Sequence, residues 1–318
     1  MNNNSNVYFK VINAGILCTF QDLGRFQQGS LGLTTGGPAD KAAYLWANRL
    51  LNNPANSPVL ELSFGGLTLV ANTFTTIAIT GAKALLTING QPKENWQSHH
   101  IKPDDEINIG FASQGCRIYL AVADGFLVKQ QFGSASTVVR EKVGGSNGLA
   151  ISAGQLLAIT KTEKKPLYRL AKKDVPDYNN SLTLKMITGY QHSLFDRYEI
   201  AKFFANEYQI SSQCDRMGYR LTGTSIQSKI SKMFSEGICQ GAVQIPPDGQ
   251  PIVLSNDRQT IGGYPKIGSV LSRDLDYLMQ CSQGNKVNFE PISIHCAHNI
   301  LHLAKAKYQR TQLLKVAM

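Results

Sequence analysis

The sequence predicts a mainly β protein with a few helices, a β-rich α+β fold arranged as two domains. The chain has 318 residues, which exceeds the usual size of one compact core and suits two domains. Short runs rich in β-branched residues alternate with glycine-containing turns along most of its length, as in β-rich proteins. Hydrophobic residues make up 42% and charged residues 17% of the chain, a balance typical of globular rather than disordered proteins.

Closely spaced strands are expected in the first half. Asn89-Gly90 predicts a hairpin turn, because both residues tolerate positive φ at the central turn positions. The expected strands are residues 7–13, 59–63, 67–71, 74–80, 85–88, 107–111 and 117–122.

One helix is expected to interrupt these strands. It begins near Pro38, which suits a first helical turn because its missing N–H is not needed there. Ala43, Ala47 and Leu50 recur at helical spacing and predict one apolar face. The helix should end at Asn52-Asn53-Pro54.

The second half restarts after a basic stretch at residues 161–180, which carries Pro166 and Pro176 and is the expected domain boundary. The predicted domains are residues 1–165 and 166–318. Strands are expected at residues 182–187, 219–221, 242–245, 251–254 and 287–289, and helices at 194–204, at 269–279 and from 299 into a basic tail.

The charge distribution argues against a nucleic-acid partner. The net charge is +10, but residues 161–174 and 301–318 together hold +8 of it. A basic linker and a basic tail are more often solvated segments than a binding face.

Targeting signals are not evident. The first six residues are polar and are not a signal peptide, and no apolar run approaches the roughly 20 residues of a membrane helix. The six cysteines are scattered without a Cys-x-x-Cys pair, which favours reduced thiols. We therefore expect a cytoplasmic protein that does not interact with membranes.

Residues 235–266 combine polar side chains with glycine- and proline-fixed turns between short strands. Such turns let backbone N–H groups converge on a ligand. Arg258 suits a carboxylate or phosphoryl oxygen, because guanidinium groups donate two parallel hydrogen bonds. Lys266 adds a point charge, and the amides of Gly262 and Gly263 could receive an anion.

Acidic and phenolic groups complete this candidate site. Asp257 and Glu236 are candidates for proton transfer or for orienting Arg258, and Tyr264 could donate a hydrogen bond to a carbonyl group. The alternative interpretation is structural: Asp248-Gly249 is then only a hairpin turn, and Asp257 with Arg258 only a surface ion pair.

Several separated motifs resemble one known family. Residues 235–266 are similar to its pattern SEGI-x-x-GA-[IV]-Q-[VI]-PPDGQPI-x-L-x-x-DRQT-x-GGYPKI, and residues 215–221 to DRMGYRL. Residues 19–25 resemble T-x-QDLGR, and residues 36–40 resemble GG-x-x-D. The chain thus resembles the biotin-dependent carboxyltransferase family, which includes allophanate hydrolase subunit 2, urea amidolyase-related proteins and the C component of 5-oxoprolinase.

The resemblance implies two cyclophilin-like β-barrel domains and an enzyme that works with other polypeptides. One branch is the C component of ATP-dependent 5-oxoprolinase, which opens the lactam of 5-oxo-L-proline to L-glutamate. Its partners would be a smaller paralogous B component and an A component of the lactam-utilisation family. A second branch transfers carboxyl groups to urea or a related amide with a biotin-carrying partner, and a third binds a kinase-inhibitor paralogue without catalysis.

Roles within the first branch follow from the resemblance. Arg258, Lys266, Gly262 and Gly263 would stabilise an oxyanion or phosphoryl group. The substrate contacts would come from Arg216, Gln244 and Tyr264, with Gln21 and Asp22 from the motif near the N-terminus.

Departures from the pattern bear on cofactors. No Glu-Ala-Met-Lys motif occurs, so covalently attached biotin is not expected. No G-x-x-x-x-G-K-[ST] loop is present, so ATP would bind elsewhere, on this chain or on the assembled complex. Ala135 stands where the family has arginine in GSRST, which weakens any role transferred to that loop.

Other local patterns are set aside. Ser146 lies in G-x-S-x-G but lacks the flanking strand and helix of a nucleophile elbow. His295, His298 and His302 would share one helix face, yet this spacing is common on amphipathic helices, and we predict no metal site. His99-His100 is interpreted as a surface turn pair.

Overall fold

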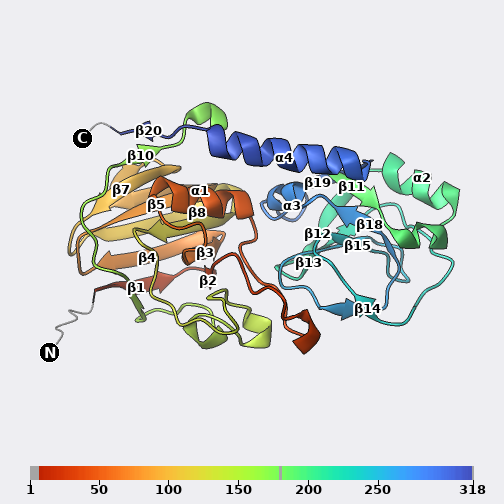
Figure 1. Ribbon diagram of the computed structural model, residues 1–318, viewed down its shortest axis with the longest axis horizontal. Coiled ribbons are helices and arrows are strands. Elements are labelled where there is room, and N and C mark those ends of the chain that lie inside the picture. Colours follow the sequence, from red (N-terminus) through yellow and green to blue (C-terminus); the bar gives the residue numbers. More distant parts are fainter. Residues whose placement is uncertain (1–6, 179–180, 317–318) are drawn as a thin grey trace. The chain divides into compact units, whose positions relative to one another are not determined.

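The computed structural model describes residues 7–178 and 181–316. These residues form two compact units. Unit 1 comprises residues 7–25, 36–177 and 312–316, and unit 2 comprises residues 26–35, 178 and 181–311. The domain division at residue 165 stays a prediction, and each unit is described separately (Figure 1).

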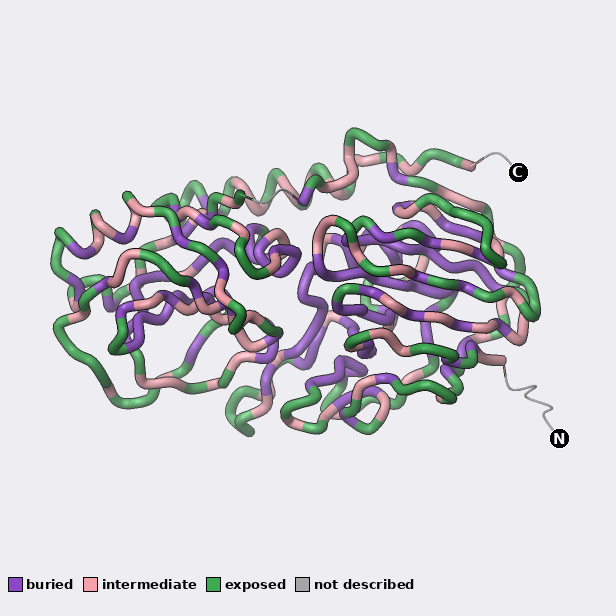
Figure 2. Tube along the Cα trace, turned by 180° about the vertical axis from the view of Figure 1, so that it is seen from behind, coloured by how far each residue is buried: buried purple, intermediate pink, exposed green. Residues whose placement is uncertain are grey.

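Unit 1 is built on an 11-stranded sheet. Its path runs β20-β10-β7-β5-β8-β4-β1-β9, with β2 and β3 paired beside β8 and β6 paired with β5. Buried aliphatic and aromatic side chains line its strands, as the purple segments of Figure 2 indicate. The strands are β1 (Tyr8–Ala14), β2 (Leu17–Gln21), β3 (Val59–Ser63), β4 (Gly65–Ala71), β5 (Thr75–Ile88), β6 (Gln91–Lys93), β7 (Gln97–Ile101), β8 (Glu106–Val122), β9 (Leu156–Ala158), β10 (Tyr168–Arg169) and β20 (Leu314–Lys315).

Helix α1 (Lys41–Leu50) confirms the predicted helix. It begins after Asp40 rather than at Pro38, because the Asp40 carboxylate accepts the N–H of Ala43 at 2.9 Å and caps the first turn. Ala43, Ala47 and Leu50 are fully buried, and the helix packs against β5 and β8.

The Asn89-Gly90 hairpin is also confirmed. Both residues have positive φ, and Ile88 pairs with Gln91 across the turn between β5 and β6. Two strands predicted on either side of Gly81 are in fact one long strand, β5. Gly81 permits this because a Cβ there would lie 2.2 Å from the Arg117 carbonyl oxygen, so only glycine allows the two backbones to approach.

The prediction for His99-His100 is wrong. Both residues lie in β7, and His99 is 6% exposed, with its Nε2 2.7 Å from the Glu94 carbonyl oxygen. Burial lowers the pKa of His99. The sequence suggested a turn because a pair of polar residues does not show the alternation of a half-buried strand.

Unit 2 contains a closed barrel in the order β11-β18-β15-β16-β13-β12-β19, with a separate ribbon β14-β17. Only β11 and β19 pair in parallel among these strands. Their bounds are β11 (Ser181–Thr188), β12 (Tyr208–Cys214), β13 (Gly218–Thr222), β14 (Glu236–Gly237), β15 (Ala242–Gln244), β16 (Ile252–Leu254), β17 (Ile261–Gly262), β18 (Lys266–Val270) and β19 (Lys286–Pro291).

Three α-helices belong to the described part of unit 2. They are α2 (Arg197–Ala205), α3 (Ser272–Leu278) and α4 (Ile294–Arg310). Helix α4 begins earlier than predicted, because the Ser293 hydroxyl caps the N–H of Cys296 at 3.1 Å.

Short 3-10 turns lie at Gly29–Leu31, Val139–Glu141, Ser146–Gly148, Lys172–Asp174 and Tyr190–Leu194. No helix in the described ranges combines the length and the apolar character needed to span a bilayer.

Alternation along the barrel strands separates an interior from an outer face. Tyr219, Val243 and Val253 are 1% exposed or less and pair across β13, β16 and β15. Their neighbours Gln244 and Ile252 therefore project from the opposite side of the barrel wall. The mainly β prediction is confirmed, and the candidate site lies on this outer face.

Candidate functional site

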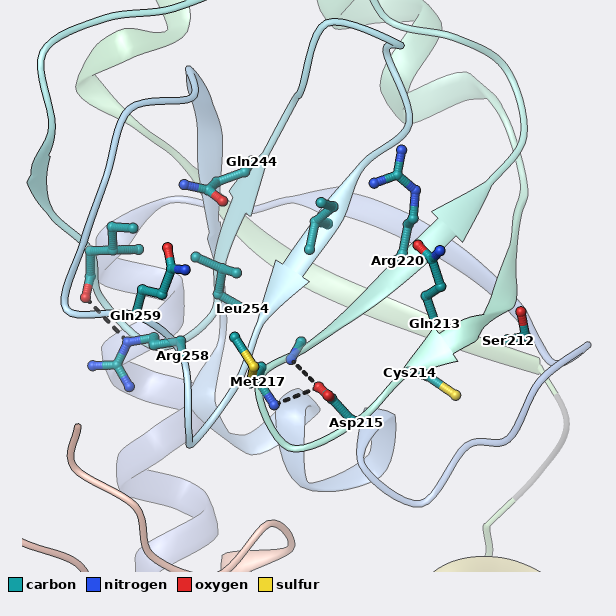
Figure 3. Close-up of a pocket in the computed structure, with 13 residues that line it drawn as sticks. Ser212, Gln213, Cys214, Asp215, Met217, Arg220, Gln244, Leu254, Arg258 and Gln259 are labelled. Carbon is teal, nitrogen blue, oxygen red and sulfur yellow. Dashed lines mark hydrogen bonds between the residues drawn. The ribbon is translucent and has the colours of Figure 1, made fainter. Parts of the chain in front are cut away.

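A pocket of about 480 Å³ lies on the outer face of the unit 2 barrel. It is lined by residues of β12, β13, β15 and β16, together with residues next to the ribbon β14-β17. Figure 3 shows the polar side chains around it. Its apolar lining includes Met217, Ile238, Ile252 and Leu254, and its polar lining includes Asp215, Arg220, Gln244, Arg258 and Gln259.

Strand register places several of these groups in one row. Arg220 pairs with Ile252, Ile252 pairs with Gln244, and Gln244 pairs with Lys266. Directly paired residues of antiparallel strands project to the same face. The barrel therefore presents a cation, an apolar side chain and a carboxamide side by side. Lys266 pairs with Gln244 next to a register shift and is not part of the pocket lining.

Gln244 is the buried polar group of this pocket. It is only 6% exposed, and its carboxamide forms no hydrogen bond with another described residue. Gly262 leaves the space for it, because a Cβ there would lie 2.9 Å from Gln244 Nε2 and 2.4 Å from Ile238 Cδ1. The predicted contact residue Gln244 thus faces the pocket with unused hydrogen-bonding groups.

Lys266 and Glu236 form an ion pair beside this row. Glu236 Oε1 also accepts from the Tyr190 hydroxyl and from Gln191 Nε2, and Gln191 Oε1 accepts the Lys266 backbone N–H at 2.8 Å. Hydrogen bonds from Lys266 and Tyr190 lower the pKa of Glu236. Glu236 is therefore ionised at neutral pH, which favours a role as the counter-ion of Lys266 over proton transfer.

Arg258 lines the pocket and is half-buried. Its Nε donates to the Ile238 carbonyl at 3.2 Å and its Nη1 to the Ser255 carbonyl at 3.3 Å. No carboxylate of the described chain pairs with it. Burial lowers the pKa of Arg258, and an anionic ligand would offset this loss of hydration.

Asp257 does not orient Arg258. Its carboxylate accepts two hydrogen bonds of 2.9 Å from Arg216 Nε and Nη2, and its backbone N–H donates to the Arg216 carbonyl at 2.7 Å. Arg216 and Asp257 are 7% and 6% exposed. The pair is buried, so the surface ion pair considered from the sequence is wrong, and Arg216 braces the loop that carries Arg258.

Tyr264 and Gly263 lie at the ribbon rather than in the pocket lining. Tyr264 is 37% exposed. The Gly263 carbonyl accepts the Met233 N–H at 3.0 Å, and a Cβ on Gly263 would lie 2.7 Å from the Met233 carbonyl oxygen. Anion binding by the amides of Gly262 and Gly263 stays a prediction.

Gln21 and Asp22 lie in unit 1 and are fully buried. Asp22 accepts the Gly24 N–H at 2.9 Å, the Ser134 hydroxyl at 2.5 Å and the Ala135 N–H at 2.7 Å. Gln21 donates to Thr19 and Thr137 and accepts from Ser136. These contacts hold two loops of unit 1 together, and the substrate contact expected of Gln21 and Asp22 stays a prediction.

Three residues of the site were not identified from the sequence. Tyr190 and Gln191 reach Glu236 across more than 40 positions, and no local pattern marks them. Gln259 lies within the singled-out segment, beside Arg258, and its carboxamide points toward Gln244 in Figure 3.

Metal ligands are a separate question. Within the part of the chain that the structure describes, no three histidine, cysteine, aspartate or glutamate side chains gather into a potential metal site. His295, His298 and His302 lie exposed on α4. Ser146 lies in a 3-10 turn and accepts a hydrogen bond from Gln155 Nε2 at 2.8 Å.

Comparison with known proteins places this site in context. The family model described as carboxyltransferase domain, subdomain A and B, matches residues 31–291. The chain is similar to the C component of 5-oxoprolinase from Escherichia coli (strain K12), at 34% identity over 90% of this chain and 91% of that protein. The protein of the same name from Haemophilus influenzae is 33% identical over 87% and 88% of the two chains.

A solved structure agrees in fold. Kluyveromyces lactis urea carboxylase superposes with a TM-score of 0.90 at 24% identity, over 99% of this chain. This chain spans 30% of that protein's length, so the likeness concerns the fold alone. The long family match and the relatives at 33–34% identity lead to one conclusion: the chain belongs to the carboxyltransferase domain family, subdomains A and B.

Proposed function

We propose that this chain is the C component of an ATP-dependent 5-oxoprolinase, a hydrolase that opens the lactam of 5-oxo-L-proline to L-glutamate. The observation that carries the proposal is the similarity to the C component of that enzyme over about nine-tenths of both chains. The proposed partners are a smaller paralogous B component and an A component of the lactam-utilisation family.

The chemistry of lactam opening explains what the site would need. An amide carbonyl is a poor electrophile, and transfer of a phosphoryl group from ATP to its oxygen makes the carbon more reactive. Water then adds to the carbon, and the C–N bond breaks as nitrogen takes a proton, which leaves an acyl phosphate. A second water hydrolyses the acyl phosphate to the carboxylate and free phosphate. Cations near the phosphorylated oxygen stabilise the charge that develops.

Lys266 and Arg258 suit this requirement. Lys266 is fixed by Glu236, and Arg258 has backbone carbonyls but no carboxylate as partners among the described residues. Both cations come from the segment that carries Gln244. We assign ATP to the assembled complex and include no covalent biotin in the proposed reaction.

Reconstitution tests the proposal. The chain is combined with the products of neighbouring genes, and L-glutamate formation from 5-oxo-L-proline is followed with and without ATP. We expect turnover only when all components and ATP are present, and we expect Arg258→Ala to lower it while circular dichroism stays unchanged. ATP-independent turnover, or full turnover without this chain, would refute the proposal.

A second function has one observation in its favour, the fold shared with urea carboxylase. In that case the chain would be a carboxyltransferase component acting on urea with a biotin-carrying partner. The same reconstitution, supplied with urea, bicarbonate and a biotin carboxylase, distinguishes the two: carboxylated urea without L-glutamate would favour this second function.

A further inference from the structure

We propose that Gln244 and Gln259 bind the cis-amide edge of a small substrate in the unit 2 pocket and so select amides over other ring compounds. This inference rests on the proposed function and assigns the recognition of its substrate to two named side chains. The same recognition applies to an open-chain amide such as urea, which also holds an N–H and its C=O on one side.

Gln244 is a buried carboxamide with unused hydrogen-bonding groups. This residue is only 6% exposed, yet its carboxamide has no hydrogen-bond partner among the described residues. Buried amides are normally paired, because an unpaired one loses its hydration without compensation. A ligand that supplies both missing partners therefore gains more here than at an exposed glutamine.

A carboxamide side chain matches the edge of a lactam in geometry. A carboxamide carries an acceptor oxygen and donor N–H groups side by side. A five-membered lactam holds its own N–H and C=O on one side, so the two amides can form a pair of parallel hydrogen bonds. A trans peptide bond directs these groups to opposite sides and cannot pair in this way.

Gln259 supplies a second carboxamide to the pocket. Gln259 also lacks a hydrogen bond with any described residue, and its amide extends toward Gln244 from the loop after β16 (Figure 3). Its N–H donors are available to the lone pair of the ligand carbonyl that Gln244 leaves unused.

The other side chains that line the pocket suit a small ring better than a further charged ligand. Ile238, Ile252 and Leu254 supply apolar surface, and about 480 Å³ lies within the usual range of small-molecule pockets. The charged lining groups are largely engaged: Arg220 pairs with Asp248, and Asp215 accepts the N–H groups of residues 217 and 218. Arg258 is the lining cation without a carboxylate partner among the described residues, and it stays available to the phosphorylated oxygen.

Calorimetric binding to the full chain, alone and in the reconstituted complex, tests the inference. The probes are 5-oxo-L-proline, urea and L-proline, which keeps the ring and carboxylate but lacks the lactam carbonyl. We expect both amides to bind and L-proline to bind at least about tenfold more weakly, because a site built for hydrogen bonds rejects a ligand that leaves them unmade.

Variants locate the effect. Gln244→Leu is expected to weaken amide binding at least about tenfold, and Gln244→Glu, which keeps the shape, is expected to weaken it because two acceptors then face each other. Gln209→Leu is the control, since Gln209 is exposed and bonded to the Gly284 carbonyl. Thermal melting confirms that each variant is folded, and Gln244→Glu decides the question if Gln244→Leu does not fold.

The outcomes separate this inference from the proposed function. Equal binding of L-proline, wild-type affinity in both Gln244 variants, or no amide binding by chain and complex would overturn the inference. If the variants lose amide binding but the wild-type complex forms no L-glutamate, the inference stands and the proposed function fails. If the complex forms L-glutamate and the Gln244→Glu complex has an unchanged KM, the proposed function stands and the inference fails.

Discussion

Replacing Arg216 with methionine should destabilise unit 2 by about 3 kcal/mol. The side chain makes two charge-assisted hydrogen bonds of 2.9 Å to Asp257, and both residues are more than nine-tenths buried. Removing one partner of such a pair leaves a buried carboxylate without its counter-ion, which typically costs roughly 3–5 kcal/mol. We take the lower end because methionine keeps most of the apolar volume of the arginine side chain.

Urea unfolding at neutral pH, followed by far-UV circular dichroism, measures this change. Arg220→Met is the matched control, because the Arg220–Asp248 pair is partly exposed and should contribute less than about 1 kcal/mol. A similar shift of the urea midpoint in both variants would mean that the buried Arg216–Asp257 pair contributes no more than the partly exposed one. An Arg216→Met complex of normal stability that had lost affinity for its substrate would instead identify Arg216 as the substrate contact expected from the sequence.

Three further predictions follow from other contacts. Gly262→Ala should weaken 5-oxo-L-proline binding about tenfold and change the stability by about 1 kcal/mol, because the new methyl group collides only with the side-chain ends of Ile238 and Gln244. An unchanged affinity by calorimetry would count against binding of the amide by Gln244. Glu236→Gln should lower the urea midpoint at neutral pH. The difference from the wild type should shrink as the pH falls below 4.5, the ordinary pKa of a glutamate, because the pKa of Glu236 is lower in the folded state and protonation removes the stability that its charge contributes. A difference that persists in acid would contradict this. Asp22→Asn should cost about 2 kcal/mol of stability, because an NH₂ group then faces one of the groups that donate hydrogen bonds to the Asp22 carboxylate. A raised KM of the complex with an unchanged urea midpoint would instead indicate a substrate contact.

Local signals in the sequence predicted local structure well. The apolar face of Ala43, Ala47 and Leu50 predicted α1, and Asn89-Gly90 predicted its hairpin. These features depend on residues close together in the chain, whose conformational preferences act whatever the rest of the fold does.

Long-range pairing could not be predicted in this way. Arg216 and Asp257 are 41 positions apart, and their ion pair depends on the register of strands that only the folded barrel fixes. From the sequence alone, Asp257 was therefore expected to interact with its neighbour Arg258. In the same way, no local pattern showed that the polar groups of Gln21 and Asp22 form hydrogen bonds inside unit 1. Their contact with substrate stays a prediction.

We propose that the cations on the outer face of the unit 2 barrel act on a bound amide. The most direct test is kcat for ATP-dependent L-glutamate formation by a complex carrying Lys266→Met, beside a complex carrying Lys229→Met, whose lysine is exposed and pairs with Asp196. We predict a kcat about 100-fold lower for Lys266→Met and an unchanged kcat for Lys229→Met. Wild-type kcat in a folded Lys266→Met complex would contradict the account.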